Sequence, residues 1–435
     1  MERFILKKLK AWKTKKRRKP LILQGARQVG KTTILEHFGK TEFADSVSIN
    51  FENDERARAI FDQDLQPARI IEALNLRLGR KIDAENTLLI FDEIQECPNA
   101  LNSLKYFCEQ APEYYICAAG SLLGVKLNQG KGFPVGKVNF LSLLPMSFLE
   151  FLIALGKENL SEYLQTLQLS DEINEAIHQD LCDLLKQYLY IGGMPEAVKT
   201  FRDERDYFSV REVQQEIIKS YLLDFAKHAP KNQIMKITQV WENLPSQLSK
   251  ENKKFVFSVL RKGARAREFE IAIQWLIDAG LVYPAYHVDT PKLPLGAYTK
   301  LNAFKLYMID VGILGAMSEL EAEVILNKNN LFQEFKGSLT ENLAAQLLKI
   351  SGLNQLYYWG SGNTAEVDFI LPKKQEITPL EIKSGLSTKK KSLQIYKDRY
   401  KPSQMYRASI MNLKIQENLV NIPLYFLENF WTDLQ

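Results

Sequence analysis

The glycine-rich string GARQVGKT at residues 25–32 constrains the fold of this chain more than any other feature. It follows the apolar run at residues 20–24 and opens the helical pattern TTILEHF, which is the strand–loop–helix context that the consensus G-x-x-x-x-G-K-[ST] requires. Glycines let such a loop wrap closely around phosphates, and backbone N–H groups at a helix N-terminus point at the anion. The sequence therefore predicts a nucleotide-binding P-loop within an α/β domain.

The residues of this loop have distinct expected roles. Lys31 should reach the β and γ phosphates, and Thr32 should ligate Mg²⁺. ATP and Mg²⁺ are therefore the expected ligands. The predicted nucleotide-binding residues are Gly25, Ala26, Arg27, Gln28, Val29, Gly30, Lys31, Thr32 and Thr33.

Two later strands end in candidate catalytic groups. The apolar run LLIFDE ends in Asp92, which would hold the water shell of Mg²⁺, and in Glu93, which can take a proton from the attacking water. The run YYICAAG ends in Ser121, at a place where P-loop enzymes usually keep a group that senses the γ phosphate. A helix cap and a simple strand-to-turn serine are the structural alternatives. The expected catalytic residues are Glu93, Lys31 and Ser121, with Thr32 and Asp92 at the metal.

The chain of 435 residues is long enough for two to four domains. Between residues 20 and 145, strand-length apolar runs without polar alternation alternate with helical patterns, which predicts a doubly wound parallel sheet. Helical spacing then continues, a helix–Gly–hairpin pattern ends near residue 290, and strands return after residue 350. We expect an ATPase domain at 1–150, a helical lid at 151–205, a winged-helix-like region at 206–316 and a C-terminal domain at 317–435.

Charge and composition restrict the partners. The net charge is +5 with 46% hydrophobic residues, which is ordinary for a globular protein. No apolar run is long enough to span a membrane, so we expect a cytoplasmic protein without a membrane partner. Nine basic residues between Lys7 and Lys19 could meet phosphates or an acidic partner, or could form a solvated amphipathic helix. The four cysteines and four histidines have no metal-ligand spacing and are interpreted as structural.

Several motifs together resemble a known family. The strings GARQVGKTT, LLIFDEIQ, AAGS, LLPMSFLEF and YIGGMPEAV are similar to those of predicted AAA-like ATPases of bacteria and archaea, which carry a C-terminal DUF4143 domain. The resemblance implies the ASCE type of P-loop ATPase. It also implies that Pro195 of the Gly-Met-Pro string contacts adenine from the lid, unless it only ends a turn. Where this family usually has Gly-Arg, the chain has Gly136-Lys137, and lysine cannot pair bidentately with a phosphate as an arginine finger could.

A second group of charged residues lies near the C-terminus. Asp368 and Glu381 fall on two strands that a turn at residues 372–374 would join into a hairpin, and Lys383 shares a face with Glu381. With Glu341 on the preceding helix, their order resembles the PD-(D/E)XK nuclease fold, in which the acids bind Mg²⁺ and the lysine positions the attacking water. A second metal site is thus expected at Glu341, Asp368, Glu381 and Lys383. A retained but inactive nuclease fold and a solvated ion-pair cluster are the alternatives.

These observations lead to a function hypothesis with two rivals. We expect an ATPase module whose nucleotide state is coupled to a nuclease-like C-terminal domain. One rival is a DNA-binding regulator that uses ATP as a switch and contacts phosphates through Arg261, Lys262, Arg265 and Arg267; the other is an ATP-gated, metal-dependent nuclease. Expected partners are ATP, nucleic acid, and a protein partner or a second copy of the chain.

Overall fold

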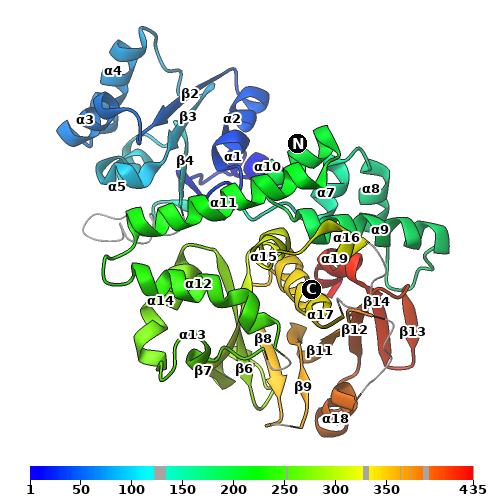
Figure 1. The fold of residues 1–435 in the computed structure, drawn as a ribbon. Helices are drawn as coiled ribbons and strands as arrows, with labels where there is room; N and C mark the ends of the chain where they lie inside the picture. The colour runs from blue at the N-terminus through cyan, green and yellow to red at the C-terminus, as the bar shows by residue number, and fades with distance from the viewer. Residues whose placement is uncertain are drawn as a thin grey trace. The chain divides into compact units, whose positions relative to one another are not determined.

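The computed structural model describes residues 1–121, 134–250, 253–326, 333–362, 364–373, 375–385 and 391–434. The chain folds into two compact units, whose elements are labelled in Figure 1. The first unit comprises residues 2–144 and 278–280. The second unit comprises Met1 and residues 145–277 and 281–435.

The first unit is built on a five-stranded sheet in which every pairing is parallel. The strands follow the order β2-β3-β4-β1-β5, so the chain crosses from β1 to the edge strand β2, returns through β3 to β4 beside β1, and ends at β5 on the other side of β1. β3 is buried along its whole length, as expected for a strand covered on both faces. The α/β fold with a parallel sheet is confirmed. Its strands are β1 (Leu21–Gly25), β2 (Asp45–Asn50), β3 (Thr87–Asp92), β4 (Tyr115–Ser121) and β5 (Asn139–Ser142).

Helices cover both faces of this sheet. In Figure 1, α1 and α2 lie on one face, and α3, α4 and α5 lie on the other. Apolar side chains of α3, α4 and α5 pack with those of β2, β3 and β4 in one core that includes Phe61, Ile70, Phe91 and Leu104. The helices are α1 (Ile5–Lys13), α2 (Lys31–Glu42), α3 (Glu55–Gln63), α4 (Pro67–Leu78) and α5 (Pro98–Gln110), with the 3₁₀ turn η1 (Ile94–Glu96).

The second unit begins with a run of helices. Ser147 and Glu150 form a capping box that starts α7, because each side chain accepts a backbone N–H of the other residue. The helices are α7 (Phe148–Ala154), α8 (Glu158–Thr166), α9 (Glu175–Ile191), α10 (Pro195–Glu204), α11 (Tyr207–His228), α12 (Ile234–Leu248), α13 (Phe257–Leu260) and α14 (Ala266–Asp278).

Two further sheets complete the second unit. After α14, strands β6 and β7 pair antiparallel, and β6 also pairs parallel with β8, so one sheet of order β7-β6-β8-β9 joins strands from before and after residue 316. The other sheet has the order β10-β11-β12-β14-β13. The strands are β6 (Val282–Val288), β7 (Thr299–Met308), β8 (Leu356–Gly360), β9 (Glu366–Val367), β10 (Phe369–Lys373), β11 (Glu376–Ile382), β12 (Met405–Ser409), β13 (Lys414–Gln416) and β14 (Leu419–Pro423).

The remaining elements of this unit are short helical segments around these sheets and one long helix, α17. The predicted hairpin is confirmed by the antiparallel register of β10 and β11, although Lys374 of its turn lies outside the described residues. The segments are η2 (Leu295–Tyr298), α15 (Val311–Met317), α16 (Ala322–Leu326), α17 (Gln333–Ile350), α18 (Lys391–Tyr400), η4 (Leu424–Phe426) and α19 (Leu427–Leu434).

A buried polar node links the helices of the second unit. The carboxylate of Asp310 accepts hydrogen bonds from the backbone N–H of Gly193 at 2.6 Å and from the side-chain amide of Gln346 at 3.2 Å. The same amide donates to the Tyr188 hydroxyl, which itself donates to the carbonyl of Met146. The node therefore connects α7, α9, α15 and α17 through groups that would be costly to bury without partners.

Candidate nucleotide site and acidic cluster

The loop between β1 and α2 has the backbone geometry of a phosphate cradle. Gly30 caps α2 at φ 90°, and Gln28 has φ 63°, so the backbone of the loop is left-handed at two places. Gly25 is required for a different reason: a Cβ at this position would lie 2.3 Å from the Leu143 carbonyl oxygen. The first N–H groups of a helix such as α2 have no partner within the helix, so an anion can bind there and is stabilised by the helix dipole.

Lys31 is the first residue of α2 and is buried within the loop. Its ammonium donates to the carbonyl oxygens of Gly25 at 3.1 Å and Ala26 at 2.8 Å. The charge is thus held beside the cradle by the loop itself. A phosphate in the cradle would find the cation already positioned.

Thr32 and Asp92 meet at the carboxyl ends of the strands, although 60 residues separate them. The Thr32 hydroxyl lies 3.0 Å and 3.1 Å from the two carboxylate oxygens of Asp92. Burial raises the pKa of Asp92, the hydrogen bond from Thr32 opposes that effect, and the nearby charge of Glu93 adds to it. A hydroxyl beside a buried carboxylate is a donor set that fits Mg²⁺, because hard cations prefer oxygen ligands.

Glu93 and Ser121 lie at the same edge of the sheet. Glu93 directly follows β3, has a left-handed backbone with φ 49°, and accepts a hydrogen bond from the side-chain amide of Gln95. Its side chain is half-buried. Ser121 ends β4 and stands opposite Gly25 of β1 in the parallel register. Both predicted groups are therefore on strand ends next to the cradle, as the parallel topology requires.

Two residues of this site were not predicted from the sequence. The Asn50 side chain donates to Asp92 at 3.1 Å, and its amide oxygen accepts from the backbone of Glu52 and Asn53. Arg3 is buried and donates to the carbonyl oxygens of Val29 in the loop and Leu144 after β5. The polar end of the strand SVSIN is a signal that could have identified Asn50. No sequence pattern around Arg3 predicts its hydrogen bonds, because its two acceptors are distant in sequence.

Other predicted contacts lie outside this constellation or remain untested. Thr33 is exposed on the first turn of α2. Pro195 is the first residue of α10 in the second unit, and its contact with adenine stays a prediction. Lys137, at the position of the family's arginine, forms an ion pair with Glu109 at 2.9 Å.

The basic segment before β1 contributes several contacts within the first unit. The Arg18 guanidinium stacks 3.5 Å from the Tyr115 ring centroid and donates to the carbonyl oxygen of Pro112. Lys10 pairs with Glu42 at 2.8 Å, and Trp12 donates to the Lys19 carbonyl. The apolar side of α1 is buried, so this segment is an amphipathic helix that packs into the domain.

The C-terminal acids converge as the sequence order suggested. Asp368 lies between β9 and β10, and its carboxylate accepts the backbone N–H of Ile382 at 2.8 Å on the neighbouring strand β11. Glu381 of β11 pairs with Lys383 at 2.6 Å. Glu341 of α17 is buried and lies close enough to Asp368 and Glu381 to influence the pKa of both.

Two cations inside this cluster, Lys253 and Lys305, were not predicted from the sequence. Lys305 of β7 is 1% exposed, and its ammonium lies 2.9 Å from Glu341, 2.7 Å from Glu366 and 4.0 Å from Asp368. Lys253 donates to the second carboxylate oxygen of Glu341, and the Tyr307 hydroxyl donates to the first. Both oxygens of Glu341 are thus already engaged by groups of the protein. We call Glu341, Glu366, Asp368, Glu381, Lys253, Lys305 and Lys383 the acidic cluster.

The pKa values of the acidic cluster follow from burial and these cations. Burial would raise the pKa of Glu341, but Lys253 and Lys305 outweigh it and hold the pKa below its usual range. Burial raises the pKa of Asp368 far above its usual value, and the charges of Glu341 and Glu381 raise it further. The pKa of Lys305 is raised despite burial, because Glu341 favours its charged form. The cluster therefore has its negative charge balanced internally.

The acidic cluster in this arrangement does not fit a divalent cation. Glu381 has one buried oxygen without a hydrogen-bond partner, but both oxygens of Glu341 already accept hydrogen bonds from Lys253, Lys305 and Tyr307, which a cation would have to displace. Across the described parts of the chain, no three His, Cys, Asp or Glu side chains are grouped so that they could hold a metal ion.

The parallel sheet, the phosphate cradle and the pair of Thr32 and Asp92 define a nucleotide-binding ATPase of the P-loop class. Comparison with family models agrees: residues 17–152 match the AAA domain, and residues 336–426 match a domain of unknown function, DUF4143. The chain therefore has an AAA-like P-loop domain and a C-terminal DUF4143 domain, the combination that the sequence motifs indicated. Residues 182–324 match a further domain of unknown function, DUF8612.

Solved structures that are similar to this chain include the following three. A Walker-type ATPase of Pyrococcus abyssi matches at 14% identity and a TM-score of 0.43, over 72% of this chain and 94% of that one. The ORC2 protein of Aeropyrum pernix, in its ADP form, matches at 15% identity and a TM-score of 0.28, over 74% and 88%. Cdc6p from Pyrobaculum aerophilum matches at 10% identity and a TM-score of 0.24, over 69% and 86%.

A search of curated proteins finds no match. Within the residues that the structure describes, no helix is both long enough and apolar enough to cross a membrane.

Proposed function

We propose that this protein binds Mg-ATP in the cradle at residues 25–32 and hydrolyses it. The observation that carries the proposal is the contact of Thr32 with Asp92 beside the buried ammonium of Lys31. Bound Mg²⁺ would neutralise charge on the β and γ phosphates, and Thr32 and Asp92 are the residues that would hold it. ATP and Mg²⁺ are thus the proposed ligands.

Each side chain of the site has one proposed task. Lys31 exchanges its loop carbonyls for phosphate oxygens, which keeps a charge-assisted hydrogen bond in either state. Glu93 accepts the proton of the attacking water, because it is half-buried, lies next to Asp92 and is held by Gln95. Ser121 senses the γ phosphate from the end of β4, and Pro195 contacts adenine.

The experiment that tests this proposal separates binding from chemistry. Lys31→Ala should lose ATP affinity in calorimetry, because it removes the cation of the cradle. Glu93→Gln keeps a hydrogen-bonding group of the same shape, so it should bind ATP nearly normally and release phosphate about 100-fold more slowly. Lys40→Ala, which removes an exposed cation near the other end of α2, serves as the control. ATP binding unchanged in Lys31→Ala would refute the P-loop role, and wild-type turnover in Glu93→Gln would place the base elsewhere.

For the C-terminal domain, we propose a nuclease-like fold that no longer uses a metal, with the ATP state acting as a switch on this domain. The order of α17, the hairpin of β10 and β11, and the acids supports the nuclease-like fold. The burial of Lys305 between three of the acids supports the loss of the metal. Since an ammonium fixed among carboxylates already neutralises them, a divalent cation would have to displace it.

A substitution at Lys305 distinguishes this proposal from a gated nuclease. In an Asp92→Asn background, which removes the metal position of the P-loop, Mn²⁺ should not change the melting temperature of the protein. Lys305→Met in that background should melt earlier without metal and should gain stability with Mn²⁺, since ligands that bind the folded state stabilise it. Lys300→Met, an exposed lysine of the same strand, is the matched control. A Mn²⁺ shift in the Asp92→Asn background that Asp368→Asn abolishes, or cleavage of plasmid DNA, would support the nuclease instead.

A second candidate function is a nucleic-acid-binding regulator in the cytoplasm, with or without a protein partner or a second copy of the chain. It is favoured by the exposed side chains of Arg261, Lys262, Arg265 and Arg267 around the start of α14. Winged-helix character in this region is part of this proposal. DNA binding that weakens steeply with salt would support it, because phosphate contacts release counterions.

A further inference from the structure

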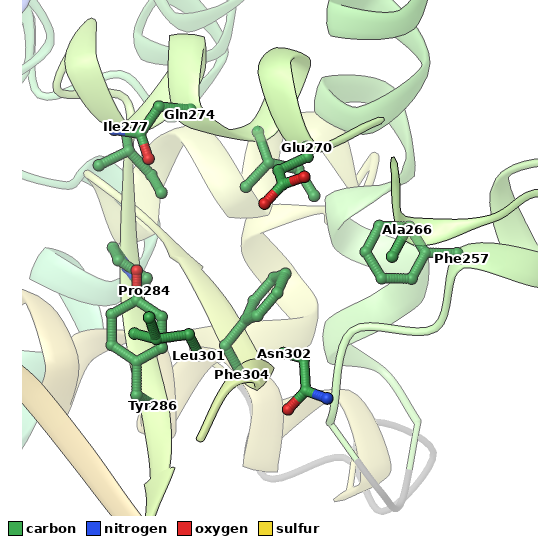
Figure 2. Close-up of a pocket in the computed structure, with 11 residues that line it drawn as sticks. Phe257, Ala266, Glu270, Gln274, Ile277, Pro284, Tyr286, Leu301, Asn302 and Phe304 are labelled. Carbon is green, nitrogen blue, oxygen red and sulfur yellow. The ribbon is translucent and has the colours of Figure 1, made fainter. Parts of the chain in front are cut away.

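A cavity of about 320 Å³ lies in the second unit between α13, α14 and the pair of β6 and β7 (Figure 2). Ala266, Glu270, Ile273 and Ile277 lie three or four residues apart, so one face of α14 forms one wall. Tyr286 and Phe304 stand opposite each other across β6 and β7 and form another wall. The volume falls at the lower end of ligand-binding pockets, which are roughly 300–1,000 Å³.

Aromatic rings dominate the strand side of this cavity. The ring centroids of Tyr286 and Phe304 are 6.3 Å apart, and those of Phe257 and Phe304 are 6.4 Å apart. Phe304 is also stacked on Phe255, which fixes its orientation. Leu301 lines the cavity while 73% exposed, so the cavity opens to solvent beside these rings. Such rings offer π-faces on which a planar ligand can stack.

Two polar side chains face the cavity without partners among the residues described. Glu270 forms no ion pair, and the amide of Asn302 forms no hydrogen bond within that part of the chain. In Figure 2, Glu270 lies on the helix side above the ring of Phe304, and Asn302 lies on the strand side below it. A carboxylate only accepts hydrogen bonds. A ligand that binds both oxygens of Glu270 therefore needs an edge with more than one hydrogen-bond donor.

The surroundings of the cavity are basic. Arg265 and Arg267 flank the lining residue Ala266, and both are exposed. Together with Lys262 they have no ion-pair partner in the described chain, whereas Arg261 is paired with Glu268. An exposed carboxylate in the lining and unpaired cations beside it suit a ligand with a hydrogen-donating planar part and an anionic part.

We propose that this cavity holds one guanine base of a single-stranded nucleic acid. The base stacks against Tyr286 and Phe304, and its N1–H and 2-amino groups donate to the two oxygens of Glu270. Arg265 and Arg267 contact the flanking phosphates. Single strands expose the base edge that duplexes hide, and aromatic stacking with edge hydrogen bonds is the usual means of reading them. The proposal deepens the nucleic-acid-binding role above and is independent of the ATP site.

Fluorescence anisotropy with 12-mer oligothymidines tests this proposal. One central thymine is replaced by guanine, hypoxanthine or adenine, and no nucleotide is added. The guanine strand should bind about tenfold more tightly than the adenine strand, the usual effect of a well-matched base contact. The hypoxanthine strand should lie between them, since hypoxanthine lacks the 2-amino group.

Substitutions of exposed residues, in the cavity and away from it, test whether the cavity causes the guanine preference. Glu270→Gln should abolish the guanine preference, and Glu162→Gln, an exposed glutamate of α8, should keep it. Arg265→Ala/Arg267→Ala should weaken all strands equally and reduce the salt dependence, whereas Lys199→Ala/Lys231→Ala, which removes as much charge elsewhere, should not. Equal affinity for guanine and adenine strands, or a guanine preference that survives in Glu270→Gln, would overturn the proposal. Binding of duplex DNA unaffected by these variants would overturn it while leaving a nucleic-acid role intact, and binding of free GMP but of no strand would reassign the cavity.

Discussion

At the scale of the residue, Glu428 of α19 is a buried carboxyl group whose pKa burial raises to about 8, although a hydrogen bond from Ser147 opposes the rise. The unfolded chain holds this proton less tightly than the folded one does. The protonated Glu428 therefore stabilises the folded state fully below about pH 4, and this stabilisation is lost progressively as the pH rises toward 8.

Glu428→Gln should remove this dependence. The melting temperature of this variant relative to that of the wild type should rise from pH 5 to about pH 8 and then level off, because glutamine stays neutral and keeps an acceptor for the Leu149 N–H. Differential scanning fluorimetry of both proteins in matched buffers checks this. A constant difference across the range would mean that Glu428 is ionised in the folded protein throughout.

The individual residues of the two sites differ in how far local sequence can predict them. The roles proposed for Gly25, Lys31 and Thr32 rest on eight consecutive residues, because the loop determines its own backbone. Asn50 and Lys305 act on partners tens of residues away, so their positions depend on strand order and register. The acids of the C-terminal hairpin and Lys383 could be predicted to converge, but Lys253 and Lys305, which also neutralise the acids, could not.

At the scale of the element, the glycines before α10 allow two segments to approach closely. Gly192 has φ 75°, and a Cβ there would lie 2.1 Å from a carboxylate oxygen of Asp310. Asp310 cannot move away without giving up its hydrogen bonds to Gly193 and Gln346. The close approach of α9 and α15 therefore requires a glycine at this position.

Gly192→Ala should lower the melting temperature of the protein strongly, by breaking the node as well as straining the backbone. Gly156→Ala is the matched control, because Gly156 has φ 73° but open space around its Cβ position. The control should lose only the free energy of unfolding that an alanine at positive φ costs, about 1 kcal/mol or somewhat more. Equal losses in the two variants would show that the contact with Asp310 is unimportant.

The elements differ in how well the sequence predicted them. The strands of the parallel sheet were recognisable because burial on both faces leaves uninterrupted apolar runs, as in TLLIFD. Helix α3 was not predicted, since its short sequence ERARAIFDQ buries only Ala57 and Phe61. The pairing of β6 with β8 joins strands about 70 residues apart, and no local pattern specifies it.

At the scale of the whole molecule, the proposed coupling of ATP turnover to the second unit makes a prediction about stimulation. Guanine-containing single-stranded DNA should raise the rate of phosphate release severalfold in the wild type. Arg265→Ala/Arg267→Ala should reduce this stimulation and leave the rate without DNA unchanged, since neither arginine belongs to the ATP site. A rate that does not respond to DNA in either protein would mean that the two units work independently of nucleic acid.

The burial of Lys305 has a consequence for how this protein depends on its environment. A metal ion is shared with every chelator in solution, whereas an ammonium group attached to the chain can neither dissociate nor be exchanged. The architecture of the C-terminal domain should therefore be indifferent to EDTA and to the supply of trace metals. Only ATP turnover at the P-loop would respond to magnesium depletion.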